Sequence, residues 1–304
     1  PLQSFREDTF HGAIAIDPVV VRVLRYESVN HQMIDLQVPR ASEEYAAQAA
    51  EGCARPLGHW SGAAASGAPS SLPVAARVCQ VLAGLAKPMD DAGPEPAASA
   101  GCGLVLEFMG RHLADASLQA TACRALAGFL PTCGQALDEA DARGVVEAVT
   151  AAMRRHAMEA AVQEAACEVI ASAVVGRSEL QSVASSQGSV EQVVCAMRQF
   201  PAEAQVQMWA CGAFASLVAN HPMNQSAVAG ARGTELVTQA MKRHLDVPQL
   251  QTMACGAFGN LAAGHPNNQS AIAACGGIDS VLTAMQRHVT SPAVQQAAIG
   301  ALWC

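Results

Sequence analysis

The sequence repeats itself with a step of 44 residues. HPMNQSAVA at residues 221–229 returns as HPNNQSAIA at residues 265–273, with two positions changed. The same step relates three columns of identical residues across five copies without insertion or deletion: Val105, Val149, Val193, Val237 and Val281; Met109, Met153, Met197, Met241 and Met285; and Gln119, Gln163, Gln207, Gln251 and Gln295. A step of about 40–47 residues is typical of helical solenoids of the HEAT or armadillo kind.

Each copy divides into three predicted helices. In the last set, a first helix at residues 267–275 follows a His-Pro pair, which breaks the chain before it. A second helix is predicted from one apolar stripe at helical spacing, formed by Ile278, Val281, Leu282 and Met285. A third helix begins after Ser291-Pro292. One such unit cannot bury its apolar stripes alone, so equal units are expected to stack, and the contact residues recur because the interface recurs.

The composition favours slim helices over a sheet. Apolar residues make up 51% of the chain but aromatic residues only 4%, so alanine supplies much of the apolar content. Alanine is the best helix former and adds little bulk, whereas strands favour β-branched and aromatic residues. The sequence has no run of 18 or more apolar residues, so no membrane span is predicted.

Charge and cysteine usage limit the partners and the compartment. The net charge is −8 and no cluster of Lys and Arg occurs, which argues against nucleic acid as a partner. The eleven cysteines include no Cys-x-x-Cys pair, which argues against zinc. Cys123, Cys167, Cys211 and Cys255 instead recur at the repeat step among alanines, as buried thiols do. Free thiols favour a reducing, intracellular compartment, the cytoplasm first and an organelle interior second.

The polar columns favour structural roles over chemistry. His112, His156, His244 and His288 share one column, but equivalent residues of stacked layers lie too far apart to bind one zinc ion. A helix-capping or surface role is therefore predicted for these histidines. The glutamine column is predicted to cap a helix or to bond between layers. The sequence contains no phosphate-binding loop, HExxH motif or nucleophile elbow, so no enzyme activity, metal or cofactor is predicted.

The predicted helices resemble those of a known family. ACGAFASLVA (210–219) and ACGAFGNLAA (254–263) resemble the armadillo third-helix pattern ALWALSNLA, and VQQAAIGALW (294–303) resembles its longer form VQEQALWAL. GGIDSVLTAM (276–285) is similar to the armadillo second helix GGIPALVQLL. The chain therefore resembles the armadillo repeat family of beta-catenin and importin alpha. The resemblance implies an all-α, right-handed solenoid with three helices per 44-residue repeat.

The resemblance also implies a domain organisation. It covers residues 101–304, as copies at 101–144, 145–188, 189–232 and 233–276 and an incomplete copy at 277–304. A degenerate copy is expected at 57–100, where residues 72–87 match a third helix. Residues 1–56 do not match and are expected to form an N-terminal cap or a docking segment.

In armadillo proteins the third helices line a concave groove, where a ladder of asparagines flanked by tryptophans holds an extended peptide. The Asn position here holds Gly128, Ser172, Ser216, Asn260 and Cys304, and the Trp position holds Arg124, Glu168, Gly212, Gly256 and Gly300. Only Asn260 matches, which argues against the importin-like reading of a basic peptide. One turn earlier on the same face lie Ala120, Glu164, Met208, Thr252 and Gln296.

Glycine in the middle of a helix costs about 0.5–1 kcal/mol relative to alanine, so something must require the space. Either a neighbouring helix packs closely there, or the glycines form a smooth trough for a partner. The face changes from charged to nearly neutral along the row, which predicts a partner segment with Arg or Lys near one end and small apolar residues at the other. The expected groove residues are Arg124, Glu164, Glu168, Met208, Gly212, Ser216, Thr252, Gly256, Asn260, Gln296 and Gly300.

Two functions are consistent with these sequence features. The first is a non-enzymatic scaffold or adaptor that binds a segment of another protein along the groove. The second is a structural subunit held rigidly in a large organellar or cytoskeletal assembly.

Overall fold

The computed structural model describes residues 95–133, 137 and 139–304, and these residues form helices and no strand. The predicted segment at 1–56 and the third helix predicted at 72–87 lie outside the described residues. The helices are α5 (Glu95–Arg111), α6 (Ala116–Cys133), α7 (Glu139–Arg155), α8 (Ala160–Ala173), α9 (Ser178–Ser186), α10 (Ser189–Gln199), α11 (Ala204–Val218), α12 (Pro222–Gly230), α13 (Gly233–Arg243), α14 (Pro248–Ala262), α15 (Pro266–Ala274), α16 (Gly277–Arg287) and α17 (Pro292–Trp303).

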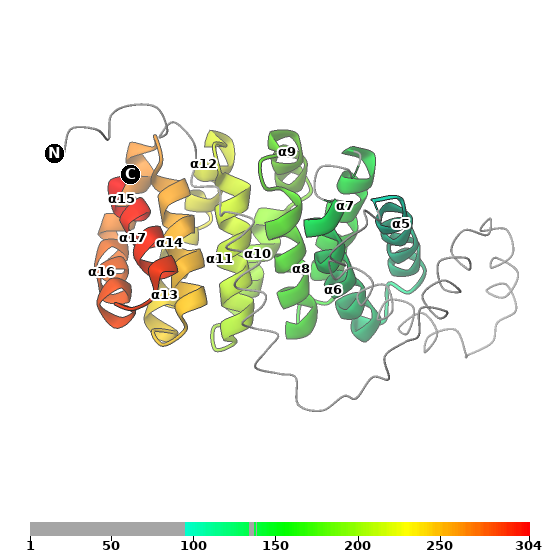
Figure 1. Ribbon diagram of the computed structural model, residues 1–304, viewed down its shortest axis with the longest axis horizontal. Coiled ribbons are helices and arrows are strands. Elements are labelled where there is room, and N and C mark those ends of the chain that lie inside the picture. The colour runs from blue at the N-terminus through cyan, green and yellow to red at the C-terminus, as the bar shows by residue number, and fades with distance from the viewer. Residues whose placement is uncertain (1–94, 134–136, 138) are drawn as a thin grey trace, which may run out of the picture.

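The helices form layers that stand in a row (Figure 1). Three layers have three helices each: α9–α10–α11, α12–α13–α14 and α15–α16–α17. They follow α5–α6 and α7–α8. The third helices of successive layers, α6, α8, α11, α14 and α17, pack side by side along the row. The predicted α-solenoid is confirmed.

The repeated columns form the core of each layer. Val149, Val193 and Val237 are fully buried at equivalent places in α7, α10 and α13. The methionine column is buried beside them, with only Met285 partly exposed. Small residues let the third helices approach closely, and in α11 every residue from 206 to 218 is buried. Burial of the same columns in each layer is what stacking of equal units requires.

The layer of α7 and α8 departs from the predicted three helices. α7 runs unbroken through Gly144, whereas the equivalent Gly188 and Gly276 have φ values of 83° and 80° and separate a first helix from a second. The residue after this turn must be small. A methyl group on Gly277 would lie 2.6 Å from Ile272 Cγ2 and 2.9 Å from Ile272 O. Val145 occupies the equivalent position in α7, where the helix continues without a turn.

The predicted apolar stripe of α16 is only partly buried. Val281 is buried, but Ile278 is 45% exposed and Leu282 is 43% exposed. The equivalent Thr234 and Thr238 of α13 are buried, because the next layer lies against them. This side of the second helix is therefore an interface between layers rather than a core within one layer.

The repeated phrase begins with a helix cap. His221 precedes α12, and its Nδ1 accepts a hydrogen bond from the backbone N–H of Asn224 at 3.3 Å. Pro222 takes the first helical position, where its missing N–H is harmless. His265 and Pro266 do the same for α15. Because Nδ1 accepts, Nε2 of His221 carries the proton and donates to Ser182 Oγ of the preceding layer, 2.9 Å away.

The rest of the phrase joins the layers. Asn224 donates through Nδ2 to Leu217 O at 2.9 Å and to Gln181 O of the preceding layer at 3.1 Å. Gln225 donates through Nε2 to Asn260 O and Ala263 O of the following layer, at 2.7 and 3.0 Å. The phrase recurs because each copy caps its own helix and bonds to the layers on both sides.

The two polar columns have separate roles. Each glutamine donates through Nε2 to two carbonyls at the end of the second helix in its own layer; Gln207, for example, donates to Met197 O and Phe200 O, both at 2.9 Å. The cap predicted for this column is confirmed. His156, His244 and His288 donate through Nε2 to a turn carbonyl of the preceding layer, at 2.8, 2.9 and 2.7 Å. These histidines therefore join layers, a role that the capping or surface prediction did not include.

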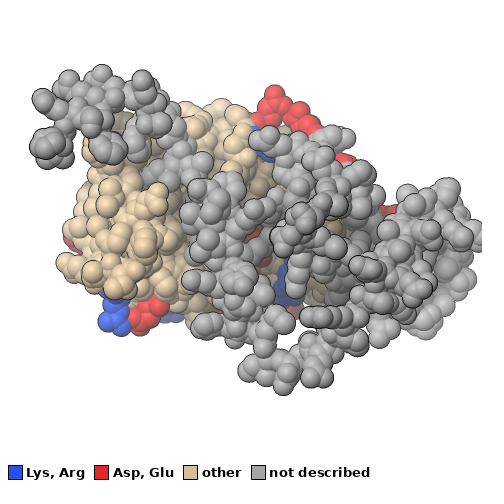
Figure 2. Space-filling model, in the orientation of Figure 1, with Lys and Arg blue, Asp and Glu red and all other residues tan. Residues whose placement is uncertain are grey.

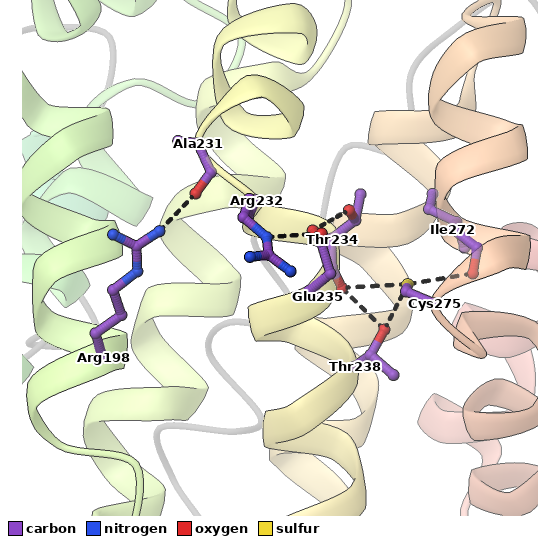
Figure 3. A network of polar contacts seen from close by, with 8 residues as sticks. All are labelled: Arg198, Ala231, Arg232, Thr234, Glu235, Thr238, Ile272 and Cys275. Atoms are coloured by element: carbon purple, nitrogen blue, oxygen red, sulfur yellow. Dashed lines mark hydrogen bonds and ion pairs between the residues drawn. The ribbon is translucent and has the colours of Figure 1, made fainter.

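Basic side chains cap the first helices across the layers. Arg198 of α10 donates to Ala231 O at the end of α12, at 3.0 Å, and Arg154 of α7 donates in the same way to Gln187 O at the end of α9. Figure 3 shows the Arg198 contact beside a second network, in which Cys275 Sγ lies 3.1 Å from Thr238 Oγ1 and donates weakly to Ile272 O. A cation at a helix C-terminus is favourable because the helix dipole is negative there.

Candidate functional site

The structure places the predicted groove residues on adjacent third helices, and these residues are called the third-helix surface below. Arg124 on α6 and Gln296 on α17 are exposed, while Glu164 and Glu168 on α8 and Gly300 on α17 are half-buried. The residues between these ends are buried: Met208, Gly212 and Ser216 on α11, and Thr252, Gly256 and Asn260 on α14. The third-helix surface therefore has accessible side chains at its two ends, whereas the predicted groove residues at its centre are buried.

The charged end of this surface carries a carboxyl in an unusual environment. Burial raises the pKa of Glu164, the Arg124 guanidinium on the neighbouring helix lowers it, and Glu203 at the start of α11 raises it again. The burial effect is the largest of the three. A carboxylate that is partly desolvated and lies near another acid gains from an added cation. This end of the surface therefore suits a basic group.

The column of Gly212, Gly256 and Gly300 is expected to reflect either close helix packing or a trough for a partner. At Gly212, crowding by neighbouring atoms does not account for the glycine. A methyl group on Gly212 would lie 3.4 Å from Met253 Sδ and 3.6 Å from Ala171 Cβ, which are ordinary contact distances. Close packing of α8 and α14 against α11 therefore leaves room for an alanine. The contrast with Gly277 shows that glycine serves a different purpose in the two columns.

Asn260 is used within the fold. It is 1% exposed, and its Nδ2 donates to Ala215 O of α11 at 2.9 Å. The bond joins α14 to the third helix of the preceding layer. The single residue that matches the asparagine ladder of armadillo proteins thus binds a backbone carbonyl of this chain.

The cysteine column forms a line of thiols through the core. Cys123, Cys167, Cys211 and Cys255 are fully buried, as the sequence predicts. Burial raises the pKa of the Cys211 and Cys255 thiols to about 12, with the neighbouring thiol adding to the effect at Cys211. Burial also raises the pKa of Cys167, which has thiols on both sides. These groups are inert packing residues at neutral pH.

The buried thiols should make the fold less stable at alkaline pH. In the unfolded chain a thiol ionises near pH 8.5, whereas in the fold these thiols stay protonated until about pH 12. The contribution of the buried thiols to stability is complete below the pKa of the unfolded chain, and it is lost as the pH rises towards the pKa of the folded chain. We expect the free energy of unfolding to fall by up to about 1.4 kcal/mol per pH unit for each thiol.

Urea unfolding at neutral pH and near pH 10 measures this loss. The Cys211→Ala variant should lose less stability between the two pH values than the unaltered chain. Equal losses in both proteins would show that buried thiols do not cause the pH dependence.

Among the described residues, no enclosed pocket or cluster of metal-ligating side chains forms a second candidate site. Two shallow hollows lie between second helices on the outer face. One of about 470 Å³ is lined by Lys242 and Arg243 among others, and one of about 160 Å³ lies one layer further along. Neither includes a residue of the third-helix surface. In the described part of the chain, His, Cys, Asp and Glu do not gather in threes as metal ligands would.

The same part of the chain holds no helix that combines the length and the apolar character that crossing a bilayer requires.

The residues that sequence reasoning missed are those that join the layers. Gln225 and Asn224 are nearly fully buried although they are polar, and each makes two hydrogen bonds. The signal was present in the sequence, because a repeated phrase that keeps its polar residues indicates that those residues are bonded. The pairing of each serine with the next histidine, as in Ser226 Oγ and His265 Nε2 at 3.0 Å, is a further regularity of this kind.

Comparison with known families agrees with the geometry. A sequence model of the LRRK2 ARM repeat family matches residues 134–303, which is more than half of the chain. The chain belongs to the LRRK2 ARM repeat family. The match covers the ARM layers from α7 to α17.

Solved structures support the same ARM-like fold. Three crystal structures of engineered proteins from a structural genomics consortium resemble this chain. The first has a TM-score of 0.58 and 22% identity, over 75% of this chain and 87% of that one. The second has a TM-score of 0.59 and 20% identity, over 75% of this chain and 90% of that one. The third has a TM-score of 0.60 and 23% identity, over 78% of this chain and 55% of that one. At these identities the likeness concerns the fold alone. No curated protein matches the chain.

Proposed function

We propose that this ARM repeat chain is a protein-interaction scaffold that holds a segment of a partner protein along its third-helix surface. The observation that carries the proposal is the row of third helices, whose accessible residues change from charged at α6 and α8 to uncharged at α17. A solenoid of this kind offers an extended face rather than an enclosed pocket. The chain acts without chemistry of its own.

The environment of Glu164 supports a definite partner chemistry. The half-buried Glu164 and Glu168 lie on one helix, with Glu203 close to the former. A lysine or arginine near one end of the partner segment would compensate these acids. Small apolar residues would follow towards Gly300, where α17 carries no charge. The free thiols of the described residues support a reducing intracellular compartment as the place of action.

We expect charge reversal at the acidic end to abolish binding. The Glu164→Arg, Glu168→Arg double variant replaces attraction between the acids and a basic partner residue by repulsion. Such a reversal should weaken the affinity for the partner by about tenfold or more. Affinity purification with mass spectrometry identifies the partner, and titration of the purified partner then measures the loss.

Glu191→Arg provides the matched control, since it reverses an exposed acid on α10, a second helix outside the third-helix surface. The control should bind as the unaltered chain does. A double variant that binds the same partner with unchanged affinity would exclude the third-helix surface as the binding site.

The alternative is a structural subunit of a large assembly, and one observation favours it. Met208, Thr252 and Asn260 at the centre of the surface are at most 7% exposed, which leaves a partner few side chains to contact there. Such a subunit should be recovered only with its neighbours, whereas a scaffold should purify alone as a cooperative monomer or defined oligomer.

A further inference from the structure

The turns between second and third helices form one edge of the solenoid, and exposed apolar side chains follow this edge. One column of these turns holds Leu113, Ala157, Pro201, Leu245 and Val289, with Met158 next to Ala157. Outside α16 and α17, the described residues expose five large apolar side chains, and four of them lie here: Leu113 (48%), Met158 (69%), Leu245 (37%) and Val289 (71%). We call residues 111–115, 155–159, 198–203, 243–247 and 287–291 the turn edge, which is at the lower side of Figure 1.

The fold holds the turn edge in a fixed arrangement. Histidine side chains bond three of the four pairs of neighbouring turns, from His156 to Leu113 O, from His244 to Pro201 O and from His288 to Leu245 O. Phe200 takes the histidine position in the remaining turn. Each turn also closes on itself, as in the bond from the Val247 N–H to His244 O at 3.2 Å. The apolar side chains therefore project from a rigid row with the spacing of the layers.

Charged residues flank the apolar row in a constant order. On the side of the second helices lie Arg111, Arg155, Arg198 and Arg243, and towards the third helices lie Asp115, Glu159, Glu203 and Asp246. In sequence order, each of the first four layers thus carries a base before its apolar turn residue and an acid after it. Arg198 also donates to Ala231 O, and Asp246 pairs with Arg287, whereas Arg155 and Glu159 lie exposed on both sides of Met158. Figure 2 shows basic and acidic side chains next to each other at the left end of the lower edge.

This order determines which partner suits the edge. Bases and acids balance, so a phosphate-rich surface such as a nucleic acid or an anionic membrane gains little. The edge instead fits a surface with the same row of apolar groups and the charges in reverse order. A second copy of the chain, turned about a two-fold axis that runs along the row of layers, presents that surface. Apolar residues then meet their own counterparts, and Arg155 of each copy faces Glu159 of the other.

We propose that two copies of this chain associate through their turn edges, side by side and in the same direction. The two-fold axis passes along the column from Leu113 to Val289. The third-helix surface takes no part in this contact, so the pair presents two such surfaces. The proposal does not rest on the scaffold function, because its apolar row and its charge exchange use other residues; Glu203 alone lies near both sites.

Sedimentation equilibrium at micromolar concentration tests the proposal on the full chain. The expected mass is twice the 31.3 kDa of one copy. The Met158→Glu, Leu245→Glu double variant should weaken association by about tenfold or more and return the mass to one copy. Both residues are exposed, so helical content and thermal unfolding should stay unchanged.

A charge exchange tests the geometry. Arg155→Glu and Glu159→Arg should each weaken the dimer, and the two changes together should restore it, because the exchanged charges face each other across the axis. Met158→Cys and Leu245→Cys should each form a disulfide-linked dimer in mild oxidant, beyond any formed by the unaltered chain.

Four results would overturn the proposal, the last of them binding to membranes. One is a monomeric chain at all concentrations. Another is association that Leu302→Glu on α17 abolishes and the turn-edge variants leave intact, which would place the contact at the last layer. The third is failure of the exchanged charges to restore the dimer. Binding of the chain to anionic phospholipid vesicles, lost in the Met158→Glu, Leu245→Glu variant, would assign the edge to a membrane surface instead.

Discussion

Replacing Gly233 by alanine should destabilise the chain by about 2 kcal/mol, because the added methyl group has no space. It would overlap the side chain of Val228 and lie 2.9 Å from the carbonyl oxygen of the same residue. The carbonyl belongs to the backbone of α12 and cannot move without breaking the turn into α13. Thermal and urea unfolding of the variant measure the loss.

Gly230→Ala is the matched control, three residues earlier. No atom lies within 4 Å of a methyl group placed there, and the residue is helical. Alanine should leave stability unchanged or raise it by up to about 1 kcal/mol, because it restricts the unfolded chain. If both variants lost the same stability, the loss would come from the helix ends and not from the close contact at Gly233.

Gln225→Leu should cost about 2–3 kcal/mol, the second large effect expected for this chain. The leucine keeps the volume but removes two buried donors, and it leaves Asn260 O and Ala263 O of the next layer without their partner. Unsatisfied buried carbonyls cost more than the mean value of a hydrogen bond. Denaturant unfolding should show a lower midpoint.

The same substitution at Gln269 separates this effect from any change in helix propensity. Gln269 donates to Ala262 O and Cys304 O, but it is exposed, so water can replace both bonds. Gln269→Leu should cost less than about 1 kcal/mol. Equal losses at the two positions would contradict the view that the phrase acts through buried bonds between layers.

Much of the architecture follows from the sequence, because stacking needs the same contacts in every layer. The columns of Val193 and Met197 predicted where the core lies, and the buried Cys167 behaves as its alanine-rich surroundings indicate. The glutamine column that includes Gln207 is predicted either to cap a helix or to bond between layers. Its hydrogen bonds to carbonyls at the end of the second helix show that it caps that helix. These features depend on short-range periodicity, which a sequence displays directly.

Other features depend on contacts that periodicity does not encode. α7 is unbroken at Val145, at a place where a turn precedes Ser189, Gly233 and Gly277 in later layers, and α5 is unbroken at the equivalent Gly101, so the residue at this place does not by itself decide whether a turn forms. The exposure of the third-helix surface depends on how closely α8, α11 and α14 approach one another. A column shows that Met208 and Asn260 share one face of their helices, but it does not show how much of that face remains open.

The hydrogen bonds between layers have a consequence for how such a chain can change length. Gln181 bonds to Ser216 O and Ala219 O, and one repeat later Gln225 bonds to Asn260 O and Ala263 O. Removal of residues 189–232 would bring Gln181 opposite the carbonyls that Gln225 now serves. A gene that gains or loses whole blocks therefore keeps the glutamine bonds of this junction matched, so evolution can adjust the reach of the molecule in fixed increments and reuse the same contact.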